Sequence, residues 1–267
     1  MFYGKTVVIK YGGSAMIDPG LKEAVTKDIV LLKYIGINTV VVHGGGPEVS
    51  HMMDRLGKKP RFINGLRVTD QETMEIVEMV LAGRINKEIV ALINKSGGKG
   101  VGLSGRDGNL IVARQRNSEL GFVGDIKAVN PDILHVLSRE GFIPIIAPIA
   151  SDEEGRPYNI NADHVAGHIA AALKADKLIL LTDVEGVFAD PDDKTTLLSL
   201  ISAEDIRDII HDGSVSGGMI PKLEACVSAL EGGVSRAHII DGRVVHSLLL
   251  EIFTNEGIGT MVVKGQL

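Results

Sequence analysis

The residues of this 267-residue sequence that could carry chemistry lie in turns combining glycine with lysine. The first turn follows a β-branched run at residues 6–9, where Lys10 is succeeded by Gly12 and Gly13. Glycines without a Cβ allow a tight turn whose backbone N–H groups can contact a phosphate or carboxylate, and the lysine adds positive charge. The pattern is neither GxxxxGK[ST] nor GxGxxG, so an ordinary strand-to-helix turn beside a surface lysine remains the alternative.

Two more glycine turns share this character. Gly44-Gly45-Gly46 follows a buried run at residues 39–42, and Gly217-Gly218 precedes Lys222 at the start of a helix, where the helix dipole attracts anions. Lys10 and Lys222 come from opposite ends of the sequence, so they could straddle one transferring phosphoryl group. An aspartate between them would hold both ammonium groups, and such a site needs no covalent intermediate.

Two polar motifs leave alternatives open. Arg67 precedes a predicted helix, and its planar guanidinium could bind a carboxylate or simply form a surface ion pair. Asn159-x-Asn161-x-Asp163 resembles the opening of an EF-hand calcium loop, but positions 164 and 170 are His and Ala where that loop needs Gly and Glu. Calcium is therefore disfavoured, which leaves a helix cap or polar groups that orient catalytic lysines and bind substrate.

Composition limits the class of protein. The 28 basic and 34 acidic residues give a net charge of −6, which disfavours nucleic acid or a membrane surface as partner. The one cysteine, Cys226, excludes an internal disulfide, fits a reducing cytoplasm and is interpreted as a buried structural thiol. The eight histidines include no HExxH, so we expect no structural zinc and interpret His43 as structural. Without an 18-residue apolar run or a recognisable export signal, the sequence predicts a soluble cytoplasmic protein.

The elements that must position these groups alternate between strand and helix. Buried strands at residues 6–9 and 39–42 each lead through glycines into a helix, the pattern of parallel strands joined by crossovers. We expect a hairpin within residues 57–68 and then a long helix to residue 95, opened by a Thr69-x-x-Glu72 capping box and used for the core and a subunit interface. Further strands are expected at residues 101–103, 110–113, 122–128, 143–149, 177–181, 237–240 and 259–263, and further helices at 131–139, 165–173, 202–211, 221–231 and 247–253.

Together these motifs resemble the amino acid kinase family, over nearly the whole chain. The motifs, in the family's order, are Ile9-Lys10-Tyr11-Gly12-Gly13-Ser14, Val42-His43-Gly44-Gly45-Gly46-Pro47, Asn64-Gly65-Leu66-Arg67-Val68-Thr69, Asn159-Ile160-Asn161-Ala162-Asp163, Leu181-Thr182-Asp183-Val184-Glu185-Gly186-Val187 and Gly217-Gly218-Met219-Ile220-Pro221-Lys222. The third and fourth of these are similar to the branch of the family that phosphorylates the side-chain carboxylate of N-acetyl-L-glutamate in arginine biosynthesis.

The resemblance implies an α/β fold, a three-layer αβα sandwich around one mainly parallel open sheet. An N-terminal lobe, residues 1–174, would bind N-acetyl-L-glutamate and form a dimer, and a C-terminal lobe, residues 175–267, would bind ATP. Lys10 and Lys222 would stabilise the transition state, with Asp163 organising them.

The resemblance also implies the ligand contacts. Gly44, Gly45, Arg67 and Asn159 would hold N-acetyl-L-glutamate, with Arg67 on its α-carboxylate. The residues expected at ATP are Gly12, Gly13, Asp183, Val184, Glu185, Gly186, Val187, Phe188, Ser214, Val215 and Ser216. Mg²⁺ would be bound mostly through the ATP phosphates and water, without a metal site made by the protein alone.

The C-terminal residues 246–260 are similar to the tail of family members that L-arginine inhibits. The resemblance implies that Glu251 and Gly257 contact this inhibitor. Those members begin with an extra helix that interlocks dimers into a hexameric ring, and this sequence starts where that helix would already have ended. We therefore expect a homodimer rather than a hexamer.

Other functions of the same fold remain as alternatives. Kinases acting on N-acetyl-aminoadipate, carbamate, aspartate or glutamate would differ in pocket size, which the sequence does not show. A non-catalytic amino-acid sensor is disfavoured by the presence of both lysines and Asp163. A nicotinamide dehydrogenase is disfavoured by the missing GxGxxG.

Overall fold

The centre of the computed structural model, which describes residues 2–190, 192–254 and 257–265, is an eight-stranded sheet. Its strand order is β14-β16-β15-β11-β1-β2-β8-β5. In that order the strands are Leu200–Ser202, Thr260–Val263, Arg236–Asp241, Lys177–Thr182, Thr6–Tyr11, Asn38–His43, Ile143–Ala147 and Gly100–Ser104. Every neighbouring pair is parallel except β15 with β16, so the predicted α/β fold with a mainly parallel sheet is confirmed.

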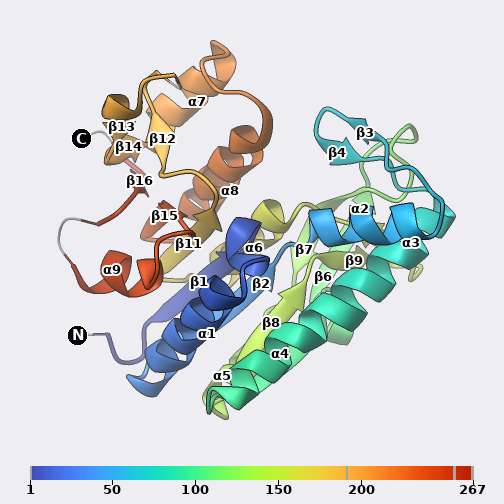
Figure 1. The fold of residues 1–267 in the computed structure, drawn as a ribbon, viewed down its shortest axis with the longest axis horizontal. Coiled ribbons are helices and arrows are strands. Elements are labelled where there is room, and N and C mark those ends of the chain that lie inside the picture. The colour runs from blue at the N-terminus through green and yellow to red at the C-terminus, as the bar shows by residue number, and fades with distance from the viewer. Residues whose placement is uncertain (1, 191, 255–256, 266–267) are drawn as a thin grey trace.

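Helices cover both faces of this sheet (Figure 1). One face carries α1 (Pro19–Tyr34), α2 (Gly46–Arg55), α3 (Gln71–Glu78), α4 (Asn86–Lys95) and α9 (Ser247–Phe253). The other carries α5 (Asp132–Arg139), α6 (Ala162–Ala172), α7 (Ala203–His211) and α8 (Ile220–Glu231). Successive side chains of a strand point to opposite faces, so each buried strand supplies two hydrophobic cores.

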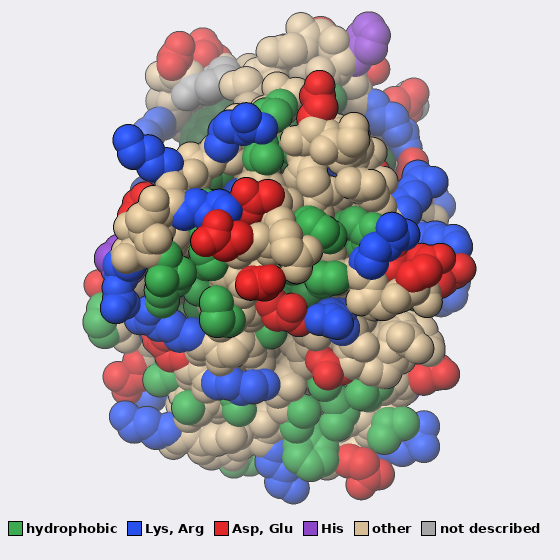
Figure 2. Space-filling model, turned by 90° about the vertical axis from the view of Figure 1, so that its right-hand side faces the viewer, with side chains coloured by type: hydrophobic (Ala, Val, Ile, Leu, Met, Phe, Trp, Pro, Cys, Tyr) green, Lys and Arg blue, Asp and Glu red, His purple; other side chains and the backbone are tan. Residues whose placement is uncertain are grey.

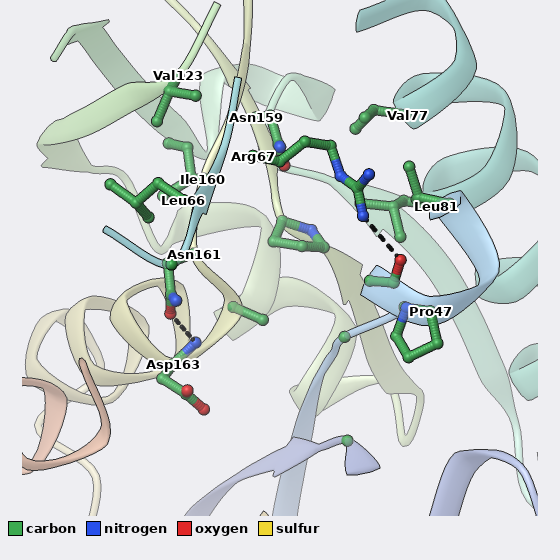
Figure 3. A pocket seen from close by; sticks show the side chains of 18 of the residues that line it. Pro47, Leu66, Arg67, Val77, Leu81, Val123, Asn159, Ile160, Asn161 and Asp163 are labelled. Carbon is green, nitrogen blue, oxygen red and sulfur yellow. Dashed lines mark hydrogen bonds between the residues drawn. The ribbon is translucent and has the colours of Figure 1, made fainter. Parts of the chain in front are cut away.

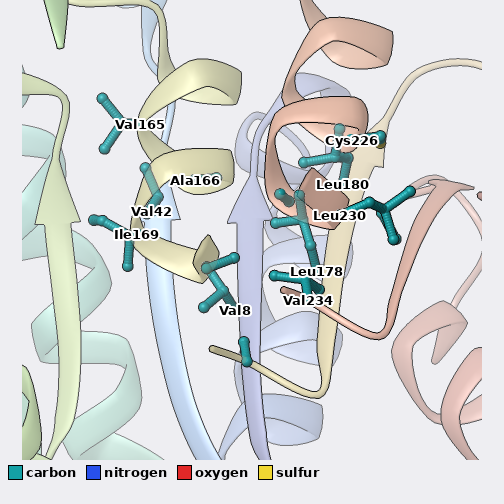
Figure 4. Packing of buried hydrophobic residues seen from close by; sticks show 14 of the residues in the cluster. Val8, Val42, Val165, Ala166, Ile169, Leu178, Leu180, Cys226, Leu230 and Val234 are labelled. Atoms are coloured by element: carbon teal, nitrogen blue, oxygen red, sulfur yellow. The ribbon is translucent and has the colours of Figure 1, made fainter. Parts of the chain in front are cut away.

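The packing of α6 and α8 illustrates this alternation. Val8 and Leu178 pack in the core beneath these helices, whereas their neighbours Val7 and Ile179 belong to the core on the opposite face. Figure 4 shows Val8 and Leu178 facing side chains of both helices. One of these side chains is Cys226, which is fully buried. Strands buried on both faces read as continuous apolar runs, which is why they could be predicted from the sequence.

A second sheet contains four strands in the order β10-β9-β6-β7 and was not predicted. Its strands are Pro157–Asn159, Ile149–Ser151, Ile111–Gln115 and Gly124–Val129. The predicted strand at residues 143–149 is in fact two strands, because Pro148 lacks the N–H needed to continue the ladder. β8 therefore ends at Ala147 in the large sheet, and the chain enters the small sheet at Ile149.

The predicted hairpin in residues 57–68 is confirmed as β3 (Phe62–Ile63) paired with β4 (Leu66–Arg67). The remaining short strands, β12 (Val187–Phe188) and β13 (Leu197–Leu198), form another antiparallel pair. Figure 1 places these two hairpins at opposite ends of the molecule.

The predicted long helix after this hairpin is interrupted. A π-helical segment, Met79–Ile85, separates α3 from α4. The predicted capping box is wrong: Asp70, not Thr69, caps α3, because its side chain accepts the Thr73 N–H at 2.8 Å. By contrast, the capping box that Ser202 forms with Asp205 at the start of α7 is confirmed.

The surface carries charges of both signs. Figure 2 shows the side that lies on the right in Figure 1, where Lys and Arg side chains are interspersed with Asp and Glu. Among the helices in the described part of the chain, none has the length and apolar character needed to span a bilayer.

Candidate active site

Three charged side chains meet where β1 ends and where α6 and α8 begin. Lys10 Nζ lies 3.0 Å from Asp163 Oδ1, and Lys222 Nζ lies 3.1 Å from Asp163 Oδ2. One carboxylate thus bridges two ammonium groups from opposite ends of the sequence. The sequence analysis selected these three residues, and the structure brings them together.

Burial strengthens this cluster. The side chains of Lys10, Asp163 and Lys222 are 10%, 6% and 17% exposed. Burial raises the pKa of Asp163, but the charges and hydrogen bonds of the two lysines outweigh it and hold the pKa below its ordinary value. Asp163 is therefore ionised at neutral pH, and the cluster combines two positive charges with one negative charge.

Local structure fixes the position of each group. Asn161 caps α6: its side chain accepts the N–H of Asp163 at 2.8 Å and that of His164 at 3.2 Å. The cap interpretation of the Asn-x-Asn-x-Asp motif is therefore confirmed for Asn161. At the start of α8, Lys222 also donates to the Gly218 carbonyl at 3.2 Å. The third glycine turn thus helps to position the lysine that follows it.

A cavity of about 300 Å³ opens beside this cluster (Figure 3). The predicted site residues along its wall are Lys10, Gly12, Gly13, Gly44, Gly45, Arg67, Asn159 and Asp163. Apolar residues that the sequence analysis did not select complete the wall, among them Leu66, Val77, Leu81, Val123 and Ile160. The cavity thus joins phosphate-binding turns, a buried arginine and an apolar lining in one space.

Arg67 is a buried cation at the far side of the cavity from Asp163 in Figure 3. Its guanidinium donates to the Gly46 carbonyl at 2.9 Å and to Ser50 Oγ at 2.8 Å, and lies 4.8 Å from the centre of the Phe62 ring. Burial lowers the pKa of Arg67. In the described residues no carboxylate forms an ion pair with it, so the surface ion-pair alternative is wrong. An anion in the cavity would find this charge uncompensated.

One glycine in each of the first two turns lies close to another side chain. A Cβ at Gly12 would lie 2.5 Å from Lys10 Nζ, and a Cβ at Gly45, where φ is +146°, would lie 2.4 Å from the Ile85 side chain. The Gly44 N–H donates to the Tyr11 carbonyl at 2.8 Å and so ties the two turns together. Gly45 therefore has to be glycine, and a side chain at Gly12 would displace the Lys10 ammonium group.

A second cavity, of about 350 Å³, lies in the C-terminal part of the chain. The predicted ATP residues along its wall are Asp183, Val184, Glu185, Gly186, Val187, Phe188, Val215 and Ser216. Ser214 is exposed, does not line it, and donates its N–H to Asp212 Oδ1 at 2.9 Å. Lys194, Met219 and Arg243 also line the cavity and were missed. Arg243 follows Asp241-Gly242 at the end of a buried strand. This position is the sequence feature that could have indicated Arg243 as a site residue.

The walls of the two cavities come together at Gly13 and Asp183. Gly13 lines the first cavity and Asp183 the second. The Asp183 carboxylate accepts the N–H of Ser14, and a Cβ at Gly13, where φ is +69°, would lie 2.5 Å from it. The walls of the two cavities therefore contact each other in the turn that follows Lys10.

Comparison with known proteins identifies the family. The sequence profile of the Amino acid kinase family matches residues 5–241. The chain belongs to the amino acid kinase family. The resemblance drawn from the motifs is thereby confirmed.

Curated members of this family are similar over nearly the whole chain. Acetylglutamate kinase of Thermoanaerobacter pseudethanolicus is 58% identical over 265 residues, which cover 98% of this chain and 89% of that protein. Acetylglutamate kinase of Symbiobacterium thermophilum is 59% identical over 272 residues, covering 98% of this chain and 93% of that protein.

Solved structures share the amino acid kinase fold. N-acetylglutamate synthase from Neisseria gonorrhoeae, complexed with coenzyme A and N-acetyl-glutamate, superposes with a TM-score of 0.86 at 27% identity, covering 100% of this chain and 61% of that chain. Carbamate kinase from Giardia lamblia bound to AMP-PNP gives a TM-score of 0.72 at 18% identity, covering 99% and 100%, and shares the fold.

The tail residues predicted to contact L-arginine are neighbours in this amino acid kinase. Glu251 on α9 is buried, with Oε1 2.6 Å from His238 Nδ1 and Oε2 accepting the Ile258 N–H at 3.0 Å. A Cβ at Gly257, where φ is +64°, would lie 3.1 Å from Glu251 Oε2. Burial raises the pKa of Glu251, but His238, the Ile258 N–H and Lys177 outweigh it and lower the pKa. Residues 255 and 256 of this tail lie outside the described residues.

Two further features concern metals and the thiol. In the described ranges, no group of three or more His, Cys, Asp or Glu side chains could hold a metal ion. Cys226 is fully buried in α8, and burial raises the pKa of its thiol. The thiol is therefore a packing group, as the sequence analysis predicted.

Proposed function

We propose that this protein is an acetylglutamate kinase, which transfers the γ-phosphoryl group of ATP to the side-chain carboxylate of N-acetyl-L-glutamate in arginine biosynthesis. The observation that carries the proposal is the bridge that Asp163 makes between Lys10 and Lys222 beside the first cavity. The identity to curated acetylglutamate kinases over 98% of the chain supports the choice of acceptor.

In the proposed reaction a carboxylate oxygen of the substrate attacks the γ-phosphorus. The new P–O bond forms as the bond from the γ-phosphorus to the β,γ-bridging oxygen breaks, which gives an acyl phosphate and ADP. A carboxylate is already ionised at neutral pH, so no general base is required. Lys10 and Lys222 neutralise the charge on the transferring group, and Asp163 keeps both ammonium groups in place without taking a proton.

The first cavity is proposed to bind N-acetyl-L-glutamate. Arg67 would bind the α-carboxylate, because it is a buried cation that has no counter-ion among the residues the structure describes. The amide of Asn159, which also contacts Thr69 Oγ1 at 3.4 Å, would contact the polar acetamide, and Gly44 and Gly45 would bind through the backbone. The apolar wall suits an uncharged acetamide and disfavours the cationic amino group of plain glutamate.

The second cavity is proposed to bind ATP, with residues 1–174 and 175–267 acting as an acid-binding lobe and a nucleotide-binding lobe. Its volume lies at the lower end of the range for small-molecule sites. Gly12 and Gly13 would face the phosphates. Mg²⁺ would be carried by phosphate oxygens and water, and the Asp183 carboxylate in the cavity wall is a donor of the kind that Mg²⁺ prefers. The metal would neutralise charge on the phosphates. We place the enzyme in the cytoplasm, where ATP is available.

The proposal extends to regulation and assembly. L-arginine would bind near Glu251 and Gly257, with its guanidinium replacing His238 as the partner of the Glu251 carboxylate. A cavity of about 240 Å³ beside α9 is lined by Lys177 and Ile252 but by neither of these two residues. A homodimer would form through the helices from Gln71 to Lys95, whose Met79 side chain is 59% exposed.

The test of the proposed reaction is acyl phosphate trapping. With ATP, Mg²⁺ and hydroxylamine, N-acetyl-L-glutamate should give a hydroxamate and stoichiometric ADP. Plain glutamate, aspartate, carbamate and N-acetyl-aminoadipate should each give less than about a hundredth of that rate. Faster turnover with any of these acids would replace the proposed substrate, and ADP release without hydroxamate would exclude transfer to a carboxylate.

A further inference from the structure

The Gly44-Gly45-Gly46 turn offers hydrogen-bond donors to the cavity while its acceptors are occupied. The Gly44 carbonyl accepts from His43 Nδ1 at 2.8 Å, the Gly45 carbonyl from the Val49 N–H at 3.0 Å, and the Gly46 carbonyl from Arg67 at 2.9 Å. Within the described ranges, the N–H groups of Gly45 and Gly46 donate to no protein acceptor. A carboxylate in the cavity would therefore meet donors alone, at the positive end of α2.

His43 makes the only side-chain contact that controls the first of these carbonyls in the described structure. Its ring is fully buried, and on the opposite side Nε2 lies 3.2 Å from the Asn86 amide nitrogen. That nitrogen also lies 2.9 Å from the Ile145 carbonyl oxygen and 3.2 Å from the Leu103 carbonyl oxygen, which identifies it as the amide NH₂. Because the Gly44 carbonyl can only accept, His43 Nδ1 carries the proton, and in the neutral ring Nε2 is the unprotonated nitrogen that faces the Asn86 amide.

This arrangement is rigid. Asn86 is fully buried and is anchored to strands β5 and β8 through the two carbonyls. It begins α4 directly after the π-helical segment Met79–Ile85, whose wider turn sets the position of its side chain. Burial lowers the pKa of His43 to about 4, so the ring stays neutral at physiological pH and keeps this one tautomer.

We propose that His43 and Asn86 are positioning residues for the acid substrate, which hold the Gly44 carbonyl away from the cavity so that the glycine turn presents donors alone. The inference rests on the proposed function, because it takes the ligand at this turn to be a carboxylate. Without the His43 donor, the peptide between Gly44 and Gly45 is free to rotate. Its oxygen would then face the substrate carboxylate and repel it.

A matched pair of substitutions tests the role of His43. His43→Asn keeps an N–H near the place of Nδ1, whereas His43→Gln keeps a polar group near Nε2 and loses the donor to Gly44. We expect His43→Gln to raise the KM for N-acetyl-L-glutamate about tenfold and His43→Asn to raise it less than about threefold. The KM for ATP should change less than about twofold in both variants, since the turn does not line the second cavity.

Asn86→Leu removes the group that orients the ring and should raise the KM for N-acetyl-L-glutamate about threefold, again without a change for ATP. Should this variant not fold, the two His43 variants decide the question. Equal effects of His43→Asn and His43→Gln, or a parallel rise in both KM values, would overturn the proposal. Wild-type protein in the same assay separates a failure of the proposed function from a failure of the positioning role. An inactive wild type refutes the proposed function. An active wild type with an unaffected His43→Gln variant refutes the positioning role alone.

Discussion

The two cavities hold their charges in different ways. In the first, Lys10 and Asp163 are at most 10% exposed and form a short ion pair at the ends of buried elements. In the second, the side chains of Lys194 and Arg243 are 79% and 47% exposed, and Lys194 reaches Glu185 at 3.3 Å across solvent. Buried charges act at full strength in fixed geometry, whereas exposed ones are screened by water and salt.

Because of this difference, we expect residues of the two cavities to contribute to different steps of the reaction. The groups that must meet the transition state lie on strand and helix ends, where caps and ion pairs fix them. The second cavity instead has walls in the loops around β12 and in residues 215–219, which favour many weak contacts over one decisive contact. Substitutions in the first cavity should therefore affect turnover or acid binding strongly, and those in the second should affect ATP affinity weakly.

The largest effect is expected for Asp163→Asn. Without the negative charge, the two buried ammonium groups repel each other and leave their positions, so kcat should fall about 10³-fold. Steady-state ADP release at saturating substrates measures this. Asp163→Glu, which keeps the charge at a longer reach, should retain more activity than Asp163→Asn. A turnover above about a tenth of the wild-type value in Asp163→Asn would contradict the bridging role.

Arg67→Ala should affect acid binding rather than turnover. Loss of a buried charge-assisted contact should raise the KM for N-acetyl-L-glutamate about 100-fold, while the KM for ATP changes less than about threefold. Arg67→Lys should recover only part of the loss, because lysine lacks the planar fork. If both KM values rose by the same factor, Arg67 would be a structural residue instead.

The pKa of Asp163 predicts a pH dependence of stability. A folded-state pKa below the unfolded value of about 3.9 means that ionised Asp163 stabilises the fold above that pH, and that this stabilisation is lost as the pH falls through the folded-state pKa. Urea unfolding should show a gap in unfolding free energy between wild type and Asp163→Asn that is constant above about pH 5.5 and shrinks below about pH 4. A gap independent of pH down to about pH 2 would be inconsistent with the depressed pKa.

The smallest effect is expected in the second cavity. Lys194→Ala should raise the KM for ATP only about two- to threefold, and added salt should reduce the difference from wild type, because its charge is exposed. Lys59→Ala, at a lysine that does not line the cavity, serves as a control for net charge. A tenfold or larger effect that persists at high salt would remove the contrast between the two cavities.

The parts of the site that could be predicted from the sequence are those with a local signature. Gly45 stands out because its φ and the Ile85 side chain require glycine, Gly12 because a side chain there would displace the Lys10 ammonium group, and the strand before Lys10 because it is buried on both faces. The Ser202 capping box is likewise a local pattern. Such features depend on residues a few positions apart, so one sequence contains them in full.

The features that escaped prediction depend on distant residues. The contact between His43 and Asn86 joins positions 43 residues apart, and nothing local to either predicts it. Thr69 had the right type for a cap, but its backbone pairs with Gly121, and Asp70 caps α3 instead. The short strand Ile149–Ser151 was merged with the apolar run before it, because hydrophobicity does not show which sheet a residue joins.

The central claim is that the two lysines, held by Asp163, stabilise the transferring phosphoryl group rather than the bound nucleotide. Single-turnover phosphoryl transfer in Lys222→Ala, measured alongside the dissociation constant for ATP, tests it most directly. We expect the transfer rate to fall at least about 100-fold while the dissociation constant changes less than about threefold. A loss of ATP affinity that matches the loss of rate would contradict it.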